Sequence, residues 1–303
     1  MAELDYWVVD VFAGAALEGN PLAVVRNDAG LTTEQMQAIA REFNLSETTF
    51  VERRAPAVEA AEGVRVRIFT TLEELNFAGH PTLGTASVLR LTAPEVFAGG
   101  TVTLAENVGP IPVRFESEGL FAEMRQRDPE FGVELDPAEV ARLAGLEAAD
   151  LDPRLPPQVV STGTAFALVA LRTEQALARL DVKMDEATPW LRARGARWFY
   201  VLAPAEKRDG GPDFRARMQF EGGEDPATGS AAGCAIAWLV RHAAVRPGQR
   251  VHLRQGVEIS RPSDLYLTAA LETRTGASNS PRVVDVRVAG RTVLVATGRL
   301  FLP

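Results

Sequence analysis

The sequence is poor in the residue types on which several chemistries depend. It has one cysteine, Cys234, among 303 residues, which excludes an internal disulfide and any mechanism that needs two thiols from one chain. It has three histidines, with neither HxH nor HExxH spacing between them. Because these spacings are common among zinc ligands, their absence predicts that the protein has no metal site.

Positive charge is also scarce. Lys and Arg number 32 against 40 Asp and Glu, the net charge is -8, and no run of basic residues is present. We therefore expect no nucleic-acid partner. No apolar stretch is long enough to cross a membrane, and residues 1–5 lack the positive region that opens a secretion signal. These observations predict a cytoplasmic protein with no membrane partner.

What the sequence does contain is one short phrase written twice, at residues 80–86 (HPTLGTA) and 225–231 (DPATGSA). In each copy a polar residue precedes a proline, and glycine followed by a hydroxyl residue lies one turn later. Each phrase therefore predicts a helix start with His80 and Asp225 at equivalent positions. Small and apolar residues follow both phrases, which is typical of helices buried on nearly all sides.

The repeat predicts two domains, and 303 residues are enough for two cores. We place them at residues 1–118 and 119–303, and the last strand, near 292–303, could join the first domain. A second match supports the duplication, because Thr162 precedes Phe166 as Ser46 precedes Phe50, by four residues. On this alignment the position of Glu47 in the second half is Gly163.

Residues 33–43 predict an amphipathic helix in the first half. Thr32 or Thr33 can cap it, and Asn44 lies where a left-handed stop is expected. Strands are predicted before and after this helix, from β-branched and alternating residues such as 64–69 (VRVRIF). A mixed α+β fold follows.

Three residues have side chains suited to acid–base chemistry, and each also has a simpler interpretation. Glu47 lies on a strand among apolar neighbours, which would raise the pKa of its carboxyl, although a solvated glutamate at a strand end is the commoner case. His80 at a helix start is favoured in its neutral form and could relay a proton or act only as a cap. Asp225 is equally typical of a capping aspartate.

Gly84-Thr85 and Gly229-Ser230 are each expected to place backbone N–H groups and a hydroxyl group in the first turn of a helix. Such N–H groups bind anions without a lysine or arginine. Close helix packing that tolerates only small residues is the alternative interpretation, and the two can hold together. Asn20 could contribute to the same site or simply form a turn with Pro21.

Four segments together identify the chain as similar to the PhzF family of phenazine-biosynthesis isomerases and their relatives. They are residues 10–25, which hold DVF and GNPLAVV, and residues 44–51 (NLSETTFV), 77–84 (FAGHPTLG) and 225–233 (DPATGSAAG). The resemblance implies a fold similar to diaminopimelate epimerase, in which two pseudo-symmetric domains each wrap a curved β-sheet or barrel around a central helix. It also implies a homodimer.

The family's isomerase moves a hydrogen within trans-2,3-dihydro-3-hydroxyanthranilate by acid–base chemistry, with no cofactor or metal. By resemblance, its acid/base glutamate falls on Glu47, and its supporting residues fall on His80, Asp225 and Ser230. We expect a carboxylate substrate on the two helix starts, with contacts from Ser46, Gly79, Gly84, Thr85, Thr228, Gly229, Ala231 and Asn20.

The sequence therefore predicts a cofactor-independent isomerase that acts on a small carboxylate-bearing metabolite. Two alternatives stay open, a non-catalytic protein that binds such a metabolite and an amino-acid epimerase that works without a cysteine pair. The single Cys234 disfavours two-thiol racemisation, because it lies outside both repeat phrases.

Overall fold

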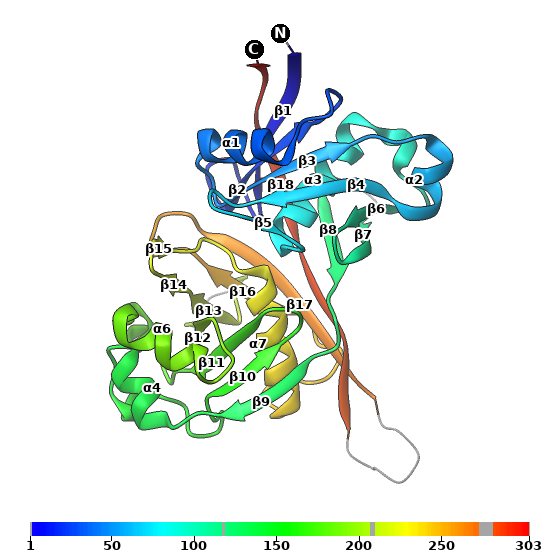
Figure 1. The fold of residues 1–303 in the computed structure, drawn as a ribbon. Coiled ribbons are helices and arrows are strands. Elements are labelled where there is room, and N and C mark those ends of the chain that lie inside the picture. Colours follow the sequence, from blue (N-terminus) through cyan, green and yellow to red (C-terminus); the bar gives the residue numbers. More distant parts are fainter. Residues whose placement is uncertain (1, 117–118, 207–209, 273–280, 303) are drawn as a thin grey trace. The chain divides into compact units, whose positions relative to one another are not determined.

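A computed structural model describes residues 2–116, 119–206, 210–272 and 281–302 (Figure 1). The chain forms two compact units, one of Met1–Met124 with Ala289–Pro303 and the other of Arg125–Val288. The predicted boundary after residue 118 lies outside the described residues and stays a prediction. None of the helices in the described ranges is long and apolar enough to cross a membrane.

The first unit is a closed β-barrel around one helix. Its strands follow one another in the order β1-β2-β3-β4-β6-β7-β8-β18, and β18 also pairs with β1. The helix α3 packs against β1, β2, β3, β6 and β7. The elements are β1 (Ala2–Val11), β2 (Asn20–Arg26), α1 (Thr33–Phe43), β3 (Glu47–Glu52), α2 (Pro56–Glu62), β4 (Val64–Phe69), β5 (Glu74–Leu75), α3 (Gly79–Thr92), a 3-10 turn (Pro94–Val96), β6 (Thr101–Glu106), β7 (Gly109–Phe115), β8 (Phe121–Arg125) and the second part of β18 (Arg282–Leu302).

The second unit wraps a sheet around a second helix, α7, which packs against β10, β11 and β17. The strand order is β9-β10-β11-β12-β13-β16-β17-β18. Its elements are β9 (Glu130–Glu134), α4 (Pro137–Leu143), a 3-10 turn (Ala148–Asp150), β10 (Gln158–Ser161), β11 (Ala165–Ala170), α5 (Glu174–Ala178), α6 (Met184–Arg192), β12 (Trp198–Pro204), β13 (Phe214–Arg217), β14 (Gln219–Phe220), β15 (Gly223–Glu224), α7 (Gly229–Arg241), β16 (Val251–Gln255), β17 (Ser263–Glu272) and the first part of β18.

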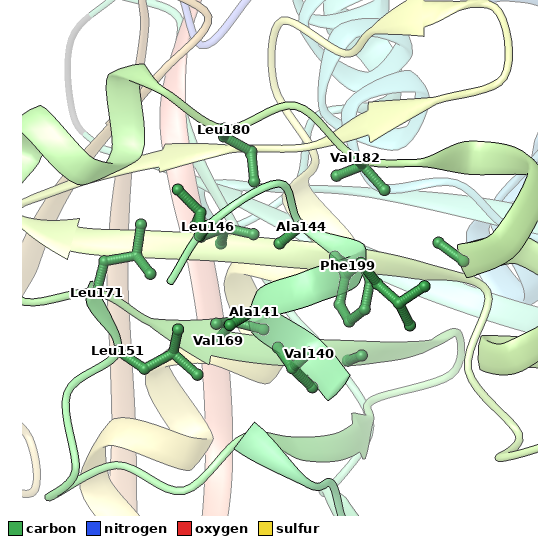
Figure 2. Close-up of a cluster of buried hydrophobic side chains, with 14 of the residues drawn as sticks. Val140, Ala141, Ala144, Leu146, Leu151, Val169, Leu171, Leu180, Val182 and Phe199 are labelled. Atoms are coloured by element: carbon green, nitrogen blue, oxygen red, sulfur yellow. The ribbon is translucent and has the colours of Figure 1, made fainter. Parts of the chain in front are cut away.

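Local sequence signals account for many of these elements. Thr32 caps α1 in a capping box with Gln35, and Asn44 ends the helix in the left-handed conformation, as predicted. In the second unit, α4 and the strands under it enclose an apolar cluster that includes Val140, Val169 and Phe199 (Figure 2). The predicted α+β fold with a curved sheet around a central helix in each half is confirmed.

The same pair of residues precedes the central helix in both units. Arg67 donates two hydrogen bonds to Glu74, and Arg217 donates two to Glu224. In each case the glutamate follows the arginine by seven residues, and the helix begins five residues after the glutamate. Gly79, the first residue of α3, is therefore equivalent to Gly229, the first residue of α7.

Strand pairing extends this equivalence to the neighbouring strands. Phe50 of β3 pairs with Arg67, and Val201 of β12 pairs with Arg217. Glu47 lies three residues before Phe50, and Trp198 lies three residues before Val201. Glu47 is therefore equivalent to Trp198.

The strands that follow the helices match in the same way. Ala105 of β6 pairs with Arg65, and Arg254 of β16 pairs with Arg215. The next residues, Glu106 and Gln255, are thus equivalent ends of equivalent strands.

Candidate active site

Glu47 and His80 meet inside the first unit. Glu47 is the first residue of β3, and His80 is the second residue of α3. Glu47 Oε2 lies 3.3 Å from His80 Nε2, and the exposed fractions of the two side chains are 16% and 7%. Glu47 and His80 were predicted to have separate roles, and the fold brings their reactive atoms together in a place largely shielded from water.

The imidazole of His80 is held neutral. Burial lowers its pKa to about 3, against the smaller opposing effect of a hydrogen bond to the Pro21 backbone. A ring nitrogen that bonds a carbonyl oxygen must carry the hydrogen, and Nε2 is the nitrogen that faces Glu47. Nε2 is therefore an acceptor, and it can bond Glu47 only while that carboxyl carries a proton. The pair is suited to holding one transferable proton.

The other predicted residues of the first unit have less accessible positions. Asn20 is fully buried at the start of β2, and Ser46 is exposed just before β3. The Thr85 hydroxyl is bonded to that of Thr49 at 2.8 Å. A Cβ on Gly84 would lie 2.6 Å from Leu22 Cδ2. For Gly84 and Thr85 these contacts match the close-packing interpretation.

In the second unit, Asp225 lies in the segment that enters α7. Its backbone N–H donates to Met218 O at 2.9 Å, and the Thr228 hydroxyl donates to Asp225 Oδ2 at 2.6 Å. Ser230 is the second residue of α7 and is partly exposed, as is Asp225. This unit thus presents a carboxylate and a hydroxyl five residues apart at the entrance to a helix.

Each central helix offers N–H groups at its first turn. The first intrahelical bond of α3 runs from Thr82 N to Ala78 O, and that of α7 runs from Ala232 N to Thr228 O. Helix geometry leaves the preceding N–H groups for other acceptors, namely those of Gly79 and His80 in α3, and of Gly229, Ser230 and Ala231 in α7. The prediction that Gly84 and Thr85 lie in the first turn of the helix is wrong, because they are the sixth and seventh residues of α3, where N–H groups bond within the helix.

The predicted register of the repeat is wrong. The phrases do not begin two helices alike, because α3 starts one residue before His80 whereas α7 starts four residues after Asp225. The structural counterpart of His80 is Ser230. Residue similarity aligned the two phrases, but α3 begins just before its phrase, at Gly79, whereas α7 begins within its phrase, at Gly229.

The predicted counterpart of Glu47 is wrong for a related reason. Gly163 precedes β11. This strand is equivalent to β2, because β2 is the parallel neighbour of β3 and β11 is the parallel neighbour of β12, the equivalent of β3. Leu22 pairs with Glu47, and Phe166 pairs with Trp198. The counterpart of Glu47 is therefore Trp198, whose indole lies 6.1 Å from the Phe166 ring.

Two buried polar residues at these helices escaped the sequence reasoning. Glu106 and Gln255 end β6 and β16, and they are 5% and 0% exposed. Both continue an alternation of inward-facing apolar residues, with Val102 and Leu104 before Glu106 and with Val251 and Leu253 before Gln255. A polar residue at the next inward position of an alternating strand is the signal that could have found them.

Cys234 is buried within α7, and burial raises the pKa of its thiol to about 11. This placement agrees with its interpretation as a small packed side chain. Among the described residues, no group of three or more histidine, cysteine, aspartate or glutamate side chains could hold a metal ion.

The second unit also has a cavity of about 280 Å³ that involves none of the predicted site residues. Leu171, Leu202 and Phe214 contribute apolar walls, and His242 and Ala243 lie at the C-terminal end of α7. The predicted site residues of the second unit, from Asp225 to Ala231, lie at the opposite end of that helix.

Comparison with known proteins gives consistent relationships. The profile of a family described as phenazine biosynthesis-like proteins (PhzC-PhzF) matches residues 9–298. A trans-2,3-dihydro-3-hydroxyanthranilate isomerase of Pseudomonas aeruginosa is 35% identical over 303 residues, which cover 98% of this chain and 99% of the relative.

Two solved structures extend this likeness to the fold. A predicted epimerase of Pseudomonas aeruginosa has a TM-score of 0.78 and 34% identity, with 99% of both chains covered. A PhzF-family protein of Bacillus anthracis has a TM-score of 0.84 and 24% identity, with 100% of both chains covered, and supports the fold alone.

Proposed function

We propose, from the premise that this chain belongs to the PhzC-PhzF family of phenazine biosynthesis-like proteins and is an isomerase, that it moves a proton within a small carboxylate-bearing metabolite without a cofactor. The substrate we propose to test first is trans-2,3-dihydro-3-hydroxyanthranilate, on which the 35% identical relative is named to act.

The contact between Glu47 and His80 carries this proposal. The ionised Glu47 carboxylate removes a proton from a substrate carbon, and the electron pair left behind is delocalised over an adjacent unsaturated bond. Neutral His80, whose Nε2 lies 3.3 Å from Glu47 Oε2, would then accept a hydrogen bond from the protonated Glu47 and keep it oriented. Glu47 then returns the proton to another carbon of the same molecule, so that atoms and electrons balance without an oxidant or a reductant.

The second unit supplies the groups that we propose to bind the substrate. The N–H groups of Gly229, Ser230 and Ala231 would bind its carboxylate, as helix N-termini commonly do. Ser230 would orient the substrate, and Asp225 would hold or relay a proton. The N–H groups of Gly79 and His80 and the exposed Ser46 complete the proposed contacts.

The test is turnover of that substrate in heavy water. We expect the wild-type protein to isomerise it, with deuterium incorporated only to the extent that the proton on Glu47 exchanges with solvent before its return, and EDTA to leave the rate unchanged. Glu47→Gln should lower kcat by about 10²- to 10⁴-fold, the usual contribution of a general acid–base. Glu52→Gln is the matched control, because Glu52 ends the same strand and bonds Asn27 at 3.2 Å. Equal rates for wild type and Glu47→Gln would remove Glu47 from this role.

An epimerase is the second candidate, favoured by the 34% identical structure described as a predicted epimerase. Chiral analysis of amino acids incubated with the protein separates the two activities, because an epimerase inverts a stereocentre and the isomerase relocates a hydrogen. Inversion that depends on Glu47 would favour the epimerase.

We further propose a cytoplasmic homodimer, as the family resemblance implies. Light scattering tests the assembly, because a dimer has twice the 32.7 kDa mass of the chain.

A further inference from the structure

Gln255 uses its whole hydrogen-bonding capacity at the entrance to α7. Its Nε2 donates to Asp225 O at 2.8 Å and to Thr228 Oγ1 at 3.0 Å. Its Oε1 accepts from Thr228 N at 3.1 Å and from the Tyr200 hydroxyl at 3.0 Å. A carboxamide has two donor hydrogens and two acceptor lone pairs, so all four are used. Three of the four bonds reach the segment that connects Asp225 to the helix.

These bonds have only one possible direction. A backbone N–H can only donate and a backbone carbonyl can only accept, so Thr228 N and Asp225 O together fix the orientation of the Gln255 amide. Since Nε2 then donates to Thr228 Oγ1, the hydroxyl hydrogen of Thr228 points to Asp225 Oδ2, 2.6 Å away. Gln255 therefore sets the direction of the hydrogen bond that the Asp225 carboxylate receives.

The surrounding chain is shaped to allow this approach. Gly256 follows Gln255 with a φ of 77°, and a Cβ there would lie 2.6 Å from Pro226 O. A second buried glutamine, Gln126, holds the first turn of the helix by donating from Nε2 to Gly229 O at 2.9 Å. Gln255 thus fixes the segment before α7, while Gln126 fixes the helix itself.

We propose that Gln255 is a positioning residue for the reaction, which acts through Thr228 to orient the Asp225 carboxylate and the first N–H groups of α7. This inference rests on the proposed function for its catalytic consequence. The contacts themselves predict that replacing Gln255 reduces the order of residues 225–228, and this loss can be measured without any substrate.

The sharpest variants are Gln255→Leu and Gln255→Glu. Leucine removes all four bonds, so amide hydrogen exchange in the peptide that spans residues 225–231 should become at least about tenfold faster, since a local hydrogen-bonded unit is lost. Glutamate keeps the acceptor atoms and loses both donor hydrogens when it is ionised. We expect kcat of Gln255→Glu to fall about tenfold or more at pH 8 and to recover partly at pH 6, where a protonated glutamate can donate again.

Two controls separate positioning from general stability. Gln158→Leu removes another buried glutamine of the same unit, whose Nε2 donates to Gly132 O at 3.0 Å, away from this segment. Tyr200→Phe removes only the bond that does not reach the segment. Both should leave exchange of residues 225–231 and kcat within about twofold of wild type.

Faster exchange confined to this segment in Gln255→Leu, with the pH-dependent recovery of Gln255→Glu, supports the proposal. If Gln255→Leu does not fold, Gln255→Glu provides both readouts at pH 8. Exchange and kcat unchanged in the Gln255 variants, or changed equally in Gln158→Leu, would overturn it. A wild-type protein that turns over no substrate contradicts the proposed function instead, and the exchange experiment still decides the role of Gln255.

Discussion

The two units hold different chemistry at equivalent positions. Where the first unit has Glu47, His80 and Glu106, the second has Trp198, Ser230 and Gln255. Every titratable group of the first set is matched by a side chain that does not ionise near neutral pH. Duplication therefore supplied one scaffold twice, and the capacity to exchange protons is concentrated in the first copy. Asp225 lies outside these matched positions, and we propose it as the proton-exchanging group that the second copy adds.

The comparison can first be tested at the glycines of the two helices. Gly233→Ala should destabilise the protein most, because its Cβ would lie 1.8 Å from Gln126 Oε1 and would displace an amide that bonds Gly229 and Thr162. We expect a loss of about 4 kcal/mol from overpacking and unmade buried bonds. Gly84→Ala meets only apolar atoms and should cost about 2 kcal/mol. Urea unfolding measures both, and a larger loss for Gly84→Ala would contradict this ranking.

Glu106→Gln places in the first unit the residue that the second unit has. Thr82 Oγ1 lies 2.7 Å from both Ala78 O and Glu106 Oε1, yet a hydroxyl has one hydrogen. If Thr82 donates to the carbonyl, Glu106 must be protonated. Burial supports this, because it raises the pKa of Glu106 to about 7, although the hydrogen bond from Thr82 and the charge of Arg65 act to lower it.

A raised carboxyl pKa means that the folded state binds more protons than the unfolded state between pH 4.5 and about 7. The free energy of unfolding therefore falls as the pH rises through this window. Glu106→Gln should remove this fall and be more stable than wild type at pH 8 by at most about 3 kcal/mol, with little difference at pH 4.5. Urea unfolding at both values measures it, and a pH-independent difference would show that Glu106 does not hold this proton.

At the second position of each helix, we expect unequal losses of activity. His80→Asn removes the acceptor that faces Glu47 and should lower kcat about 10²-fold. Ser230→Ala removes one orienting hydroxyl and should lower kcat about tenfold. Steady-state kinetics of both variants on one substrate measure the ratio. Equal losses would mean that the asymmetry between the units does not extend to catalysis.

The smallest change expected is in the titration of His80 in the first unit, which should not occur near neutral pH. Because burial lowers the pKa of His80 to about 3, its imidazole should stay neutral from pH 5 to 8, as ¹⁵N chemical shifts can show. The unfolded state takes up a proton below its ordinary pKa of 6.5, so His80 should favour unfolding as the pH falls from 6.5 toward 3. A ¹⁵N titration near pH 6.5 in the folded protein would show that the His80 imidazole is not held neutral.

Much of the fold could be predicted because it depends on local signals. The cap at Thr32 and the stop at Asn44 belong to the helix that they bound, and alternation identified strands such as β4. The family resemblance predicted the helix within each sheet. The register of the repeat could not be predicted from residue similarity between the two phrases. It is fixed by pairing between strands and by the Arg67–Glu74 and Arg217–Glu224 contacts.

The candidate site divides in the same way. Short motifs identified Glu47 and His80, but their 3.3 Å contact depends on where β3 starts relative to α3. Gln255 and Glu106 belong to no motif. Their interest lies in their hydrogen bonds near the N-terminal ends of the two helices, between Gln255 and Thr228 and between Glu106 and Thr82. Buried polar residues of this kind become interpretable only when every donor and acceptor around them can be counted.

The pairing of β1 with β18 has a consequence for how the chain matures during synthesis. Leu4 of β1 pairs with Leu300, and the register continues to Val11 with Thr292, so β1 needs as its neighbour a strand that is translated much later. Residues 125–288 form the second unit from one continuous stretch. On the ribosome, that stretch is complete before the barrel of the first unit can close. The unit that contains β1 is therefore finished last, and the β1 edge stays exposed until β18 has been translated.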